Sequence, residues 1–280
     1  MTKWSGLGIT IFPVQDNVEK LGADFSDWVD ELLANGFTQL RIGVNYWNNP
    51  IAIGISREAI AIVVAKDAKV IWGVGSAAVP ITASNWIGYR AGILTQAQWA
   101  QDNGVFEYQI GNEEEVHVDG ITITGEQMIT NLKEVATEVK QIFTNGNISY
   151  SFGFGFIDKW ILQGKGDIDI LAHNMYMGGN GSYNYPWKQE ITKLINAFGT
   201  DGFYLTEFGP SYSALDDYGN EAEQAVAVTE MINYIKSVGL KRSLFFCYYD
   251  NSKPYGPEGF GVVKTDGTKR LLWNSLINSK

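Results

Sequence analysis

Two glutamates stand directly after short runs of β-branched and aromatic residues, where side chains with a chemical role often gather. Glu113 follows Asn112 after the run Val105–Ile110, and Glu207 follows the run Phe203–Thr206. A carboxyl group that stays protonated can donate a proton to a leaving oxygen, while a second, ionised carboxylate attacks the neighbouring carbon. Cleavage of a glycosidic bond needs this pairing, so Glu113 and Glu207 are the candidate catalytic residues.

Eight such runs alternate along the chain with amphipathic stretches, a pattern typical of βα units around a parallel sheet. The predicted strands are Gly6–Phe12, Thr38–Val44, Val70–Gly75, Val105–Ile110, Ile148–Phe154, Ile168–Asn174, Phe203–Thr206 and Ser243–Tyr248. The predicted helices are Asp24–Ala34, Ser56–Lys66, Thr95–Asn103, Gly125–Thr144, Trp187–Phe198, Asn220–Val238 and Lys269–Asn278, with a short turn around Ile157–Gln163. Ser56 and Thr95 are the predicted caps of their helices, and Gln98 has capping-box spacing from Thr95.

Eight units of about 35 residues predict an α/β fold, a single (β/α)8 barrel of the TIM type over residues 1–280. A doubly wound sheet is the structural alternative, but Gly6-Leu7-Gly8 does not continue as the glycine-rich phosphate loop of that fold. In a (β/α)8 barrel the reactive side chains lie at the C-terminal ends of the strands. Glu113 and Glu207 would then face each other across the mouth from strands four and seven.

At these strand ends the sequence resembles a large clan of retaining glycoside hydrolases, clan GH-A, which share a (β/α)8 barrel. The clan includes cellulase-, mannanase- and β-xylosidase-type enzymes. Its acid/base glutamate follows an asparagine at the end of strand four, which matches Asn112 and Glu113, and its nucleophile ends strand seven, which matches Glu207. The resemblance implies a proton donor at Glu113, a nucleophile at Glu207 and a substrate-binding role for Asn112.

Further positions match the clan in strands two, six and eight. The resemblance implies that Arg41 supports the nucleophile, and an arginine within an apolar strand needs a buried anionic partner. Asn174 and Tyr176 match a polar residue followed by a tyrosine that hydrogen-bonds the nucleophile. The run Gly259–Lys269 resembles the exit of strand eight into the last helix.

The sequence departs from the clan at the end of strand eight, where most members place a tryptophan beneath the bound sugar. The stretch Phe245–Asp250 contains no tryptophan. Tyr248 or Tyr249 is one candidate for this platform. Trp47 and Trp72, which follow or lie in strands two and three, are the others.

Two assignments stay open from the sequence. Glu114 and Glu115 follow Glu113 directly, which allows a shift of the acid/base position, although the preceding Asn112 favours Glu113. His173 matches a ligand-binding histidine in some families of the clan. A strand histidine that is hydrogen-bonded in the core is an equal alternative.

Composition narrows the possible partners and cofactors. The chain has 31 acidic and 21 basic residues, a net charge of −10, which disfavours nucleic acid and anionic membrane surfaces. The longest strictly apolar run, Ala59–Ala65, is far short of the ~20 residues that span a bilayer. One cysteine and two histidines cannot form a disulfide or a His/Cys metal site, so no metal or other cofactor is expected. Met1–Trp4 has no apolar signal region, so we expect a cytoplasmic protein, or a secreted one whose signal was removed.

These observations predict a monomeric β-glycosidase with a carbohydrate substrate. Short strand-end loops favour an open groove and internal cleavage of a β-linked glucan or mannan-type polysaccharide. An exo-acting β-glycosidase and a catalytically inactive carbohydrate-binding barrel stay open as alternatives. A Schiff-base aldolase is disfavoured because Lys69 and Lys241 precede their strands. The loop aromatics that could stack on pyranose rings are Trp86, Tyr183, Tyr185, Trp187, Tyr212 and Tyr255.

Overall fold

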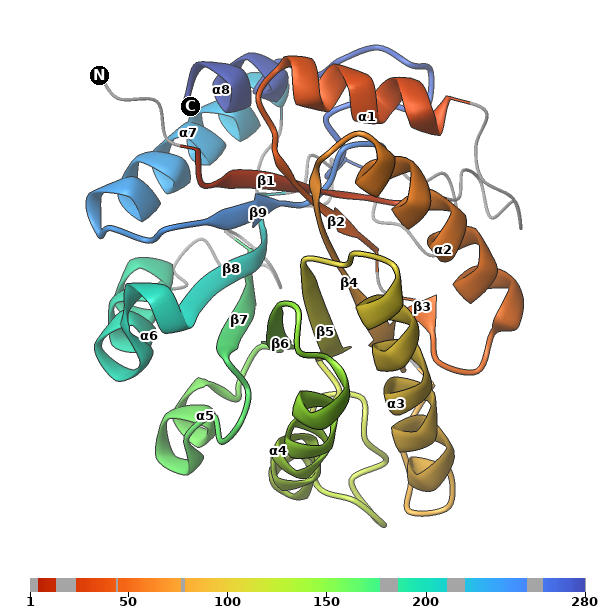
Figure 1. Cartoon of the computed structure of the whole chain (residues 1–280). Helices are drawn as coiled ribbons and strands as arrows, with labels where there is room; N and C mark the ends of the chain where they lie inside the picture. Colours follow the sequence, from red (N-terminus) through yellow and green to blue (C-terminus); the bar gives the residue numbers. More distant parts are fainter. Residues whose placement is uncertain are drawn as a thin grey trace.

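The chain forms a closed ring of eight parallel strands with helices packed around its outside (Figure 1). The computed structural model describes residues 5–13, 24–43, 45–76, 79–176, 186–210, 220–250 and 259–279. The strands are β1 (Leu7–Ile11), β2 (Gln39–Ile42), β3 (Asn45–Tyr46), β4 (Lys69–Gly75), β5 (Glu107–Asn112), β6 (Asn147–Phe152), β7 (Ile170–Met175), β8 (Phe203–Phe208) and β9 (Ser243–Phe245). The ring closes because β1 pairs with both β2 and β9, and β2 pairs with β4. The predicted (β/α)8 barrel is confirmed, and the doubly wound sheet is excluded.

The helices lie in the order that the alternation predicts. They are α1 (Phe25–Ala34), α2 (Pro50–Ala65), α3 (Trp86–Asp102), α4 (Gly125–Ile142), α5 (Ile157–Gln163), α6 (Trp187–Gly202), α7 (Glu221–Ser237) and α8 (Leu272–Asn278). The two-residue strand β3 is an addition to the eight units and pairs with the end of β4.

Helix α2 begins six residues before the predicted start at Ser56. The side chain of Asn49 accepts hydrogen bonds from the backbone amides of Ile51 and Ala52, at 3.1 and 3.0 Å. Pro50 occupies the first helical position, where its missing N–H has no partner to lose. The prediction of Ser56 as the cap is therefore wrong, and Ser56 is buried within the helix.

Helix α3 also begins earlier than predicted, at Trp86. Thr95 lies in its middle and donates a hydrogen bond to the carbonyl of Ala91, so the predicted cap at Thr95 is wrong. The capping box occurs instead at α4. There Thr124 accepts from the amide of Gln127, and the Gln127 side chain accepts from the amide of Thr124. This box fixes the end of the loop that follows β5.

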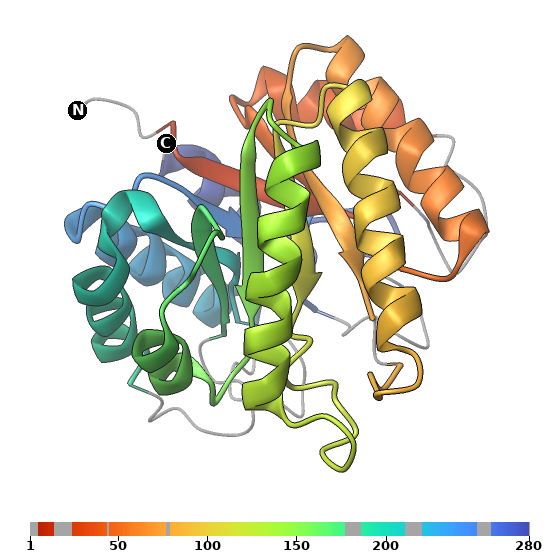
Figure 2. The same cartoon turned by 60° about the horizontal axis from the view of Figure 1, so that its bottom comes forward.

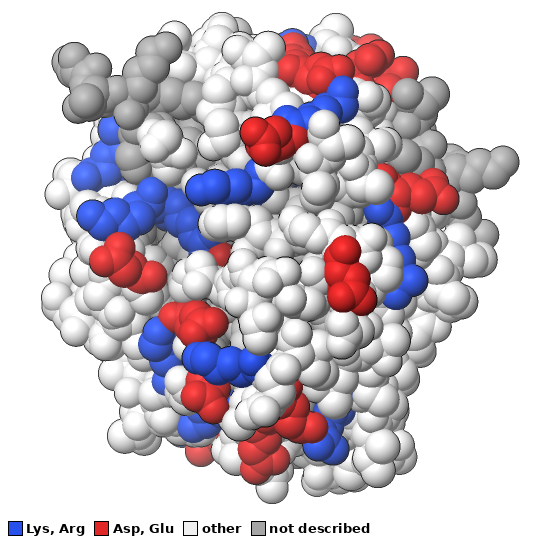
Figure 3. Space-filling model, in the orientation of Figure 1, with Lys and Arg blue, Asp and Glu red and all other residues white. Residues whose placement is uncertain are grey.

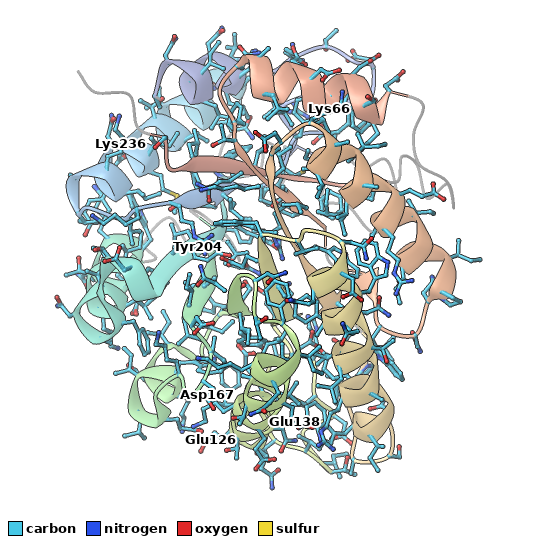
Figure 4. All side chains as sticks on the ribbon, viewed as in Figure 1. Lys66, Glu126, Glu138, Asp167, Tyr204 and Lys236 are labelled. Atoms are coloured by element: carbon cyan, nitrogen blue, oxygen red, sulfur yellow. The ribbon has the colours of Figure 1, made fainter. Side chains whose placement is uncertain are left out.

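Side chains along the strands alternate between the barrel interior and the layer beneath the helices. A small apolar cluster fills the interior, and a larger core lies between strands and helices. Tyr204 lies within the ring of strands, whereas Lys66 and Lys236 lie at its periphery (Figure 4). The interior cluster consists of Ile71, Ala172, Tyr204 and Leu244.

Strand β5 contains a β-bulge immediately before its C-terminal end. Gln109 lies opposite Ser149 of β6, whereas Asn112 lies opposite Ser151, so β5 has one more residue than its partner over this span. Gln109 and Asn112 are an odd number of positions apart, yet both reach the same interior arginine, Arg41. The bulge therefore turns the end of β5 inward by breaking the alternation.

Strand β8 contains a second bulge at the corresponding place. Leu205 pairs with His173 of β7, but the next pair joins Glu207 to Asn174, so one residue of β8 is extra. Strict alternation from the inward-facing Tyr204 would direct Glu207 toward the helices. Because of the bulge, Glu207 faces the interior.

The strands point toward one end of the barrel, and the polar side chains described below gather there. In Figure 2 the arrows of β4 and β5 point to the edge where the loop between β5 and α4 projects. Acidic and basic side chains are interspersed on the face shown in Figure 3. Across the described ranges, no helix has the length and apolar character needed to cross a membrane.

Candidate active site

Arg41 is the centre of the polar network at the mouth of the barrel. Its side chain points into the interior and is 1% exposed. Arg41 Nη1 contacts Glu207 Oε1 at 2.7 Å, and Nη2 contacts Asn112 Oδ1 at 2.9 Å. The remaining donor, Nε, contacts Gln109 Oε1 at 2.9 Å. A planar guanidinium thus joins β2 to the ends of β5 and β8, which the sequence-based assignment of Arg41 requires.

Glu207 is held by a donor on each of its carboxylate oxygens. Arg41 contacts Oε1, and the hydroxyl of Tyr176 donates a hydrogen bond to Oε2. Burial and the negative charge of Glu207 raise the pKa of the Tyr176 hydroxyl well above its usual value, so Tyr176 stays a donor. The arrangement fixes the orientation of the Glu207 carboxylate.

Glu113 reaches the same network through Asn174. Asn174 Nδ2 donates to Glu113 Oε1 at 2.9 Å and lies 3.3 Å from Asn112 Oδ1. The amide oxygen of Asn174 accepts a hydrogen bond from Ser151 at 2.8 Å, which leaves its nitrogen directed at Glu113. The five residues Arg41, Asn112, Glu113, Asn174 and Glu207 therefore converge at one mouth.

The Glu113 carboxyl has a pKa of about 7, well above its ordinary value. Burial is the largest cause, and the negative charge of Glu207 adds to it, while Asn174 and Arg41 act in the opposite direction. A carboxyl group with this pKa keeps its proton up to about neutral pH. The site thus pairs an arginine-bound carboxyl group, Glu207, with one that can donate a proton, the two groups that acid-assisted nucleophilic attack requires.

The backbone at Glu113 is unusual for a residue with a side chain. Its φ is +62°, in the left-handed region that is costly for residues other than glycine. Gly153, just after β6, makes room for this turn: a Cβ at Gly153 would lie 2.5 Å from Val116 Cγ2 and 3.2 Å from both Cβ and Cγ of Glu113. Glu114 and Glu115 are 0% and 1% exposed, and their carboxylates accept from the backbone amides of Ser76 and Gly153. Of the three glutamates, Glu113 is therefore the one whose carboxyl group joins the network of Arg41 and Asn174.

Two predicted platform residues lie between the strands and the helices rather than at the mouth. Trp72 is fully buried and packs against Trp99 and Tyr108. Tyr248 is 1% exposed, and its hydroxyl bonds to Glu31 of α1. Trp72 lies one residue after the inward-facing Ile71 of β4, and Tyr248 lies past the end of β9 with its ring against α1 and α8, so the assignment of Trp72 and Tyr248 to substrate binding is corrected.

His173 and Trp47 also lie away from the network. His173 faces the helix layer, stacks on the ring of Phe152 and contacts its carbonyl through Nδ1 at 2.8 Å. Burial lowers the pKa of His173 to about 4, so the ring is a neutral core histidine. Trp47 packs edge-on against Tyr89 and over Gly88 on α3. The alternative of a core histidine holds for His173, and neither ring is placed to bind substrate beside Glu207.

A group of aromatic rings that the sequence prediction missed surrounds Tyr176. Phe246 and Phe260 pack edge-on against Tyr176, with ring centroids 5.9 and 5.2 Å away. Phe12, at the end of β1, packs against Phe246 at 5.7 Å. Phe246 directly follows β9, and an aromatic residue at that strand end was the available signal. Phe246 thus lies beside the tyrosine that bonds Glu207.

His117 is a second residue that the sequence prediction did not place in the site. Its Nε2 lies 4.0 Å from Glu113 Oε2, and its side chain is half-buried. Partial burial lowers the pKa of His117, so the ring is neutral beside Glu113 at neutral pH. The helical spacing of four residues in the turn after β5 brings the two side chains together.

The loop aromatics divide into two groups. Trp86 packs against Tyr89, and Trp187 against Tyr234, so both stabilise helix starts. The other four predicted rings lie outside the described residues: Tyr183, Tyr185, Tyr212 and Tyr255. Among the side chains that the structure describes, no group of three or more His, Cys, Asp and Glu is placed to hold a metal ion.

Comparison with known proteins places the fold among glycoside hydrolases. A scan against protein-family models and a search of curated proteins found no match. Among solved structures, an exo-β-1,4-mannosidase from Opitutaceae bacterium strain TAV5 matches with a TM-score of 0.77 and 11% identity. The match covers 98% of this chain and 58% of that one, so the chain spans less than two thirds of that mannosidase.

Two further structures match over nearly their whole length. A GH113 β-1,4-mannanase matches with a TM-score of 0.71 and 13% identity, with 100% of both chains covered. The catalytic domain of the major endoglucanase from Xanthomonas campestris pv. campestris matches with a TM-score of 0.69 and 14% identity, covering 99% of this chain and 95% of that one. At this identity the likeness establishes the fold: the chain has the (β/α)8 barrel of the glycoside hydrolases that its sequence resembles.

Proposed function

We propose that this protein is a retaining β-glycosidase in which Glu113 is the acid/base and Glu207 the nucleophile. One observation carries the proposal. A single network, centred on Arg41 and Asn174, joins a carboxyl group paired with an arginine to a second one whose pKa is raised to about 7, at the mouth of a barrel. The fold, shared with β-mannanases and an endoglucanase, supports the same reaction class.

In the first step the carboxylate of Glu207 attacks the anomeric carbon of the sugar. The bond from that carbon to the glycosidic oxygen breaks as Glu113 transfers its proton to the oxygen. The leaving alcohol departs, and the sugar stays on Glu207 as an ester. Tyr176 and Arg41, which contact the Glu207 oxygens, hold the nucleophile in line for this attack.

In the second step a water molecule attacks the same carbon and releases the sugar. Formation of the ester removes the negative charge of Glu207, which is one of the causes that raise the pKa of Glu113. Glu113, which gave up its proton in the first step, therefore stays a carboxylate and accepts a proton from the attacking water. The proton and both carboxyl groups are restored, with the configuration of the sugar retained.

The proposed substrate is a carbohydrate, a β-linked glucan or mannan-type polysaccharide cleaved internally. Two of the matching structures are a β-1,4-mannanase and the catalytic domain of an endoglucanase, which favours this class. Another matching structure is an exo-β-1,4-mannosidase, which supports an exo-acting β-glycosidase as the second candidate. Residues 177–185, 211–219 and 251–258, in the loops after β7, β8 and β9, lie outside the described residues.

The test is a screen of the purified protein against aryl β-glycosides and soluble β-glucans and β-mannans. We expect hydrolysis of at least one class, with the β-anomer as the first product in proton NMR. Short oligosaccharides from a polymer would identify internal cleavage, and monosaccharide alone would identify exo action. Binding without hydrolysis would contradict the proposal and favour a carbohydrate-binding barrel. A first product of α configuration would contradict retention.

A further inference from the structure

The turn that follows β5 is held from both neighbouring strands. The Glu114 carboxylate accepts from the amide of Ser76, just after β4, at 3.0 Å, and further contacts come from β6. The amide of Glu113 donates to the carbonyl of Ser151, at 2.8 Å, and the carbonyl of Glu113 accepts from the amide of Val116, at 2.9 Å. Residues 113–117 therefore form a tight turn that begins with Glu113 in its left-handed conformation. Because that conformation is costly, other contacts must stabilise it.

Tyr150 of β6 is at the centre of these contacts. Its hydroxyl accepts a hydrogen bond from the amide of Glu114, at 2.8 Å, and donates one to Glu115 Oε2. The other oxygen of Glu115 accepts from the amide of Gly153, at 2.6 Å. Gly153 is the residue whose missing side chain leaves room for Glu113. Tyr150 and Glu115 thus join the backbone on both sides of the Glu113 side chain.

Glu115 is a costly residue to use as a simple anchor. Its carboxyl is fully buried, and burial, together with the nearby charge of Glu113, raises its pKa to about 7. Tyr150 and the amide of Gly153 offset part of this cost. An apolar side chain would fill the same space without desolvating a charge, so packing alone does not explain a buried carboxyl group here.

We infer that Tyr150 and Glu115 are positioning residues for Glu113: they hold the turn so that the Glu113 carboxyl can deliver its proton to the leaving group. The inference rests on the proposed function, because it assigns a purpose to the placement of the acid/base. It does not make Tyr150 or Glu115 a catalytic residue, since neither is in contact with the network of Arg41 and Glu207.

Several charged and polar groups surround the carboxyl groups of Glu113 and Glu115 and affect how their protonation depends on pH. Glu113 faces Glu207, Arg41, Asn174, Glu114 and His117. Glu115 faces Tyr150, the amide of Gly153 and Glu113. A change at Tyr150 acts on this set through Glu115 and the turn, and leaves the partners of Glu207 intact.

The test compares Tyr150→Phe with Tyr108→Phe as a matched control. Tyr108 lies on β5, is equally buried and loses one hydrogen bond, to the carbonyl of Ile93 at 2.8 Å. Both variants are assayed on aryl β-glycosides of graded leaving-group acidity. We expect Tyr150→Phe to lower kcat/KM by about 10–100-fold on the poorest leaving groups, a part of the full contribution of general acid catalysis. On a dinitrophenyl glycoside, whose departure needs no proton, the two variants should match.

A loss that is equal across all leaving groups, or the same loss in Tyr108→Phe, would overturn the inference. If Tyr150→Phe fails to fold, Glu115→Gln, which keeps the shape of the side chain, takes its place with the same expected leaving-group dependence.

A second measurement separates this inference from the proposed function. The Glu113 carboxyl is titrated by carbon-13 NMR in the wild type and in both variants, which needs no activity. A shift of the Glu113 pKa in Tyr150→Phe but not in Tyr108→Phe supports the positioning role even if the wild type cleaves no glycoside. If the wild type is active and Tyr150→Phe changes neither the titration of Glu113 nor the dependence on the leaving group, the positioning role is overturned and the proposed function stands.

Discussion

The barrel interior holds two glutamates with the same kinds of partner, one near each end. In both cases an arginine contacts one carboxylate oxygen and a tyrosine hydroxyl bonds the other. One cluster lies at the end of the barrel where the strands begin and consists of Glu107, Arg242 and Tyr204; we call it the N-terminal cluster. The mouth cluster consists of Glu207, Arg41 and Tyr176. The chemistry of the two clusters is alike, but their surroundings differ.

Glu107 is completely buried, and Arg242 and Tyr204 occupy its oxygens. Glu207 is 8% exposed and lies at the end of the barrel where Glu113, with a pKa of about 7, adds a second carboxyl group. An arginine–glutamate pair inside a barrel is therefore not by itself a sign of function. The difference lies in the second carboxyl group and in access to the mouth, at the strand ends where barrel enzymes place their chemistry.

Removing the mouth carboxylate gives the largest expected effect. Glu207→Ala should reduce kcat/KM by about 10⁴-fold or more on every glycoside, because the attacking group is lost. Azide should restore part of the rate on an activated substrate and yield the α-glycosyl azide, identified by NMR. Residual activity within tenfold of the wild type would remove the distinction between the two clusters.

Removing the second carboxyl group should give a smaller effect that depends on the substrate. Glu113→Ala should lower kcat/KM by about 10³-fold for poor leaving groups, because proton donation is lost. On a dinitrophenyl glycoside the first step should survive, visible as a burst of phenolate, and azide should yield the β-glycosyl azide. If Glu113→Ala and Glu207→Ala behave alike on this substrate, the assignment of roles is wrong.

Breaking the N-terminal cluster should affect stability instead of catalysis. Glu107→Gln leaves Arg242 with an unpaired buried charge, and we expect the free energy of unfolding to fall by about 3–5 kcal/mol. The folded fraction should keep the kcat/KM of the wild type. Urea unfolding and initial rates on the same samples measure the two quantities. A loss of kcat/KM in the folded fraction would show that the clusters are coupled.

The smallest expected effect is a shift in the pH profile. Because Glu113 must be protonated to donate, kcat/KM should decline as pH rises through about 7. In Glu207→Gln the negative charge that helps to raise the pKa of Glu113 is gone, so the carbon-13 titration of Glu113 should move to lower pH. In Glu107→Gln the titration should stay in place. If the pKa of Glu113 is the same in Glu207→Gln as in the wild type, the two carboxyl groups do not share a network.

The sequence predicts the barrel and the convergence of six polar residues, Tyr176 among them, because strand and helix periods are local signals. It does not predict which way the strand ends face. Alternation alone would direct Glu207 outward, and only the bulges in β5 and β8 bring Asn112 and Glu207 to the side of Arg41. A bulge depends on pairing between strands, which residue types in one strand do not encode.

The platform residues show the same difficulty from the other direction. Ring type favours Trp72 and Tyr248, but both rings pack under the helices. Phe246, which contacts Tyr176, has a less distinctive ring. Helix starts differ from the predicted ones where an early cap, such as Asn49, precedes a later serine.

The buried glutamates after β5 also make folding a proton-uptake reaction. Glu113 and Glu115 have pKa values of about 7 when folded, against about 4.3 in an unfolded chain. Their contribution to the free energy of unfolding is fully present below the lower value and is lost as pH rises through the upper one. Asp119 acts oppositely: hydrogen bonds led by Thr122 lower its pKa to about 2, so its contribution is lost in strong acid. The native state should therefore be more stable in mild acid than at neutral pH. The turn after β5 lowers the free energy of unfolding at neutral pH because it buries two carboxyl groups that favour their protonated forms.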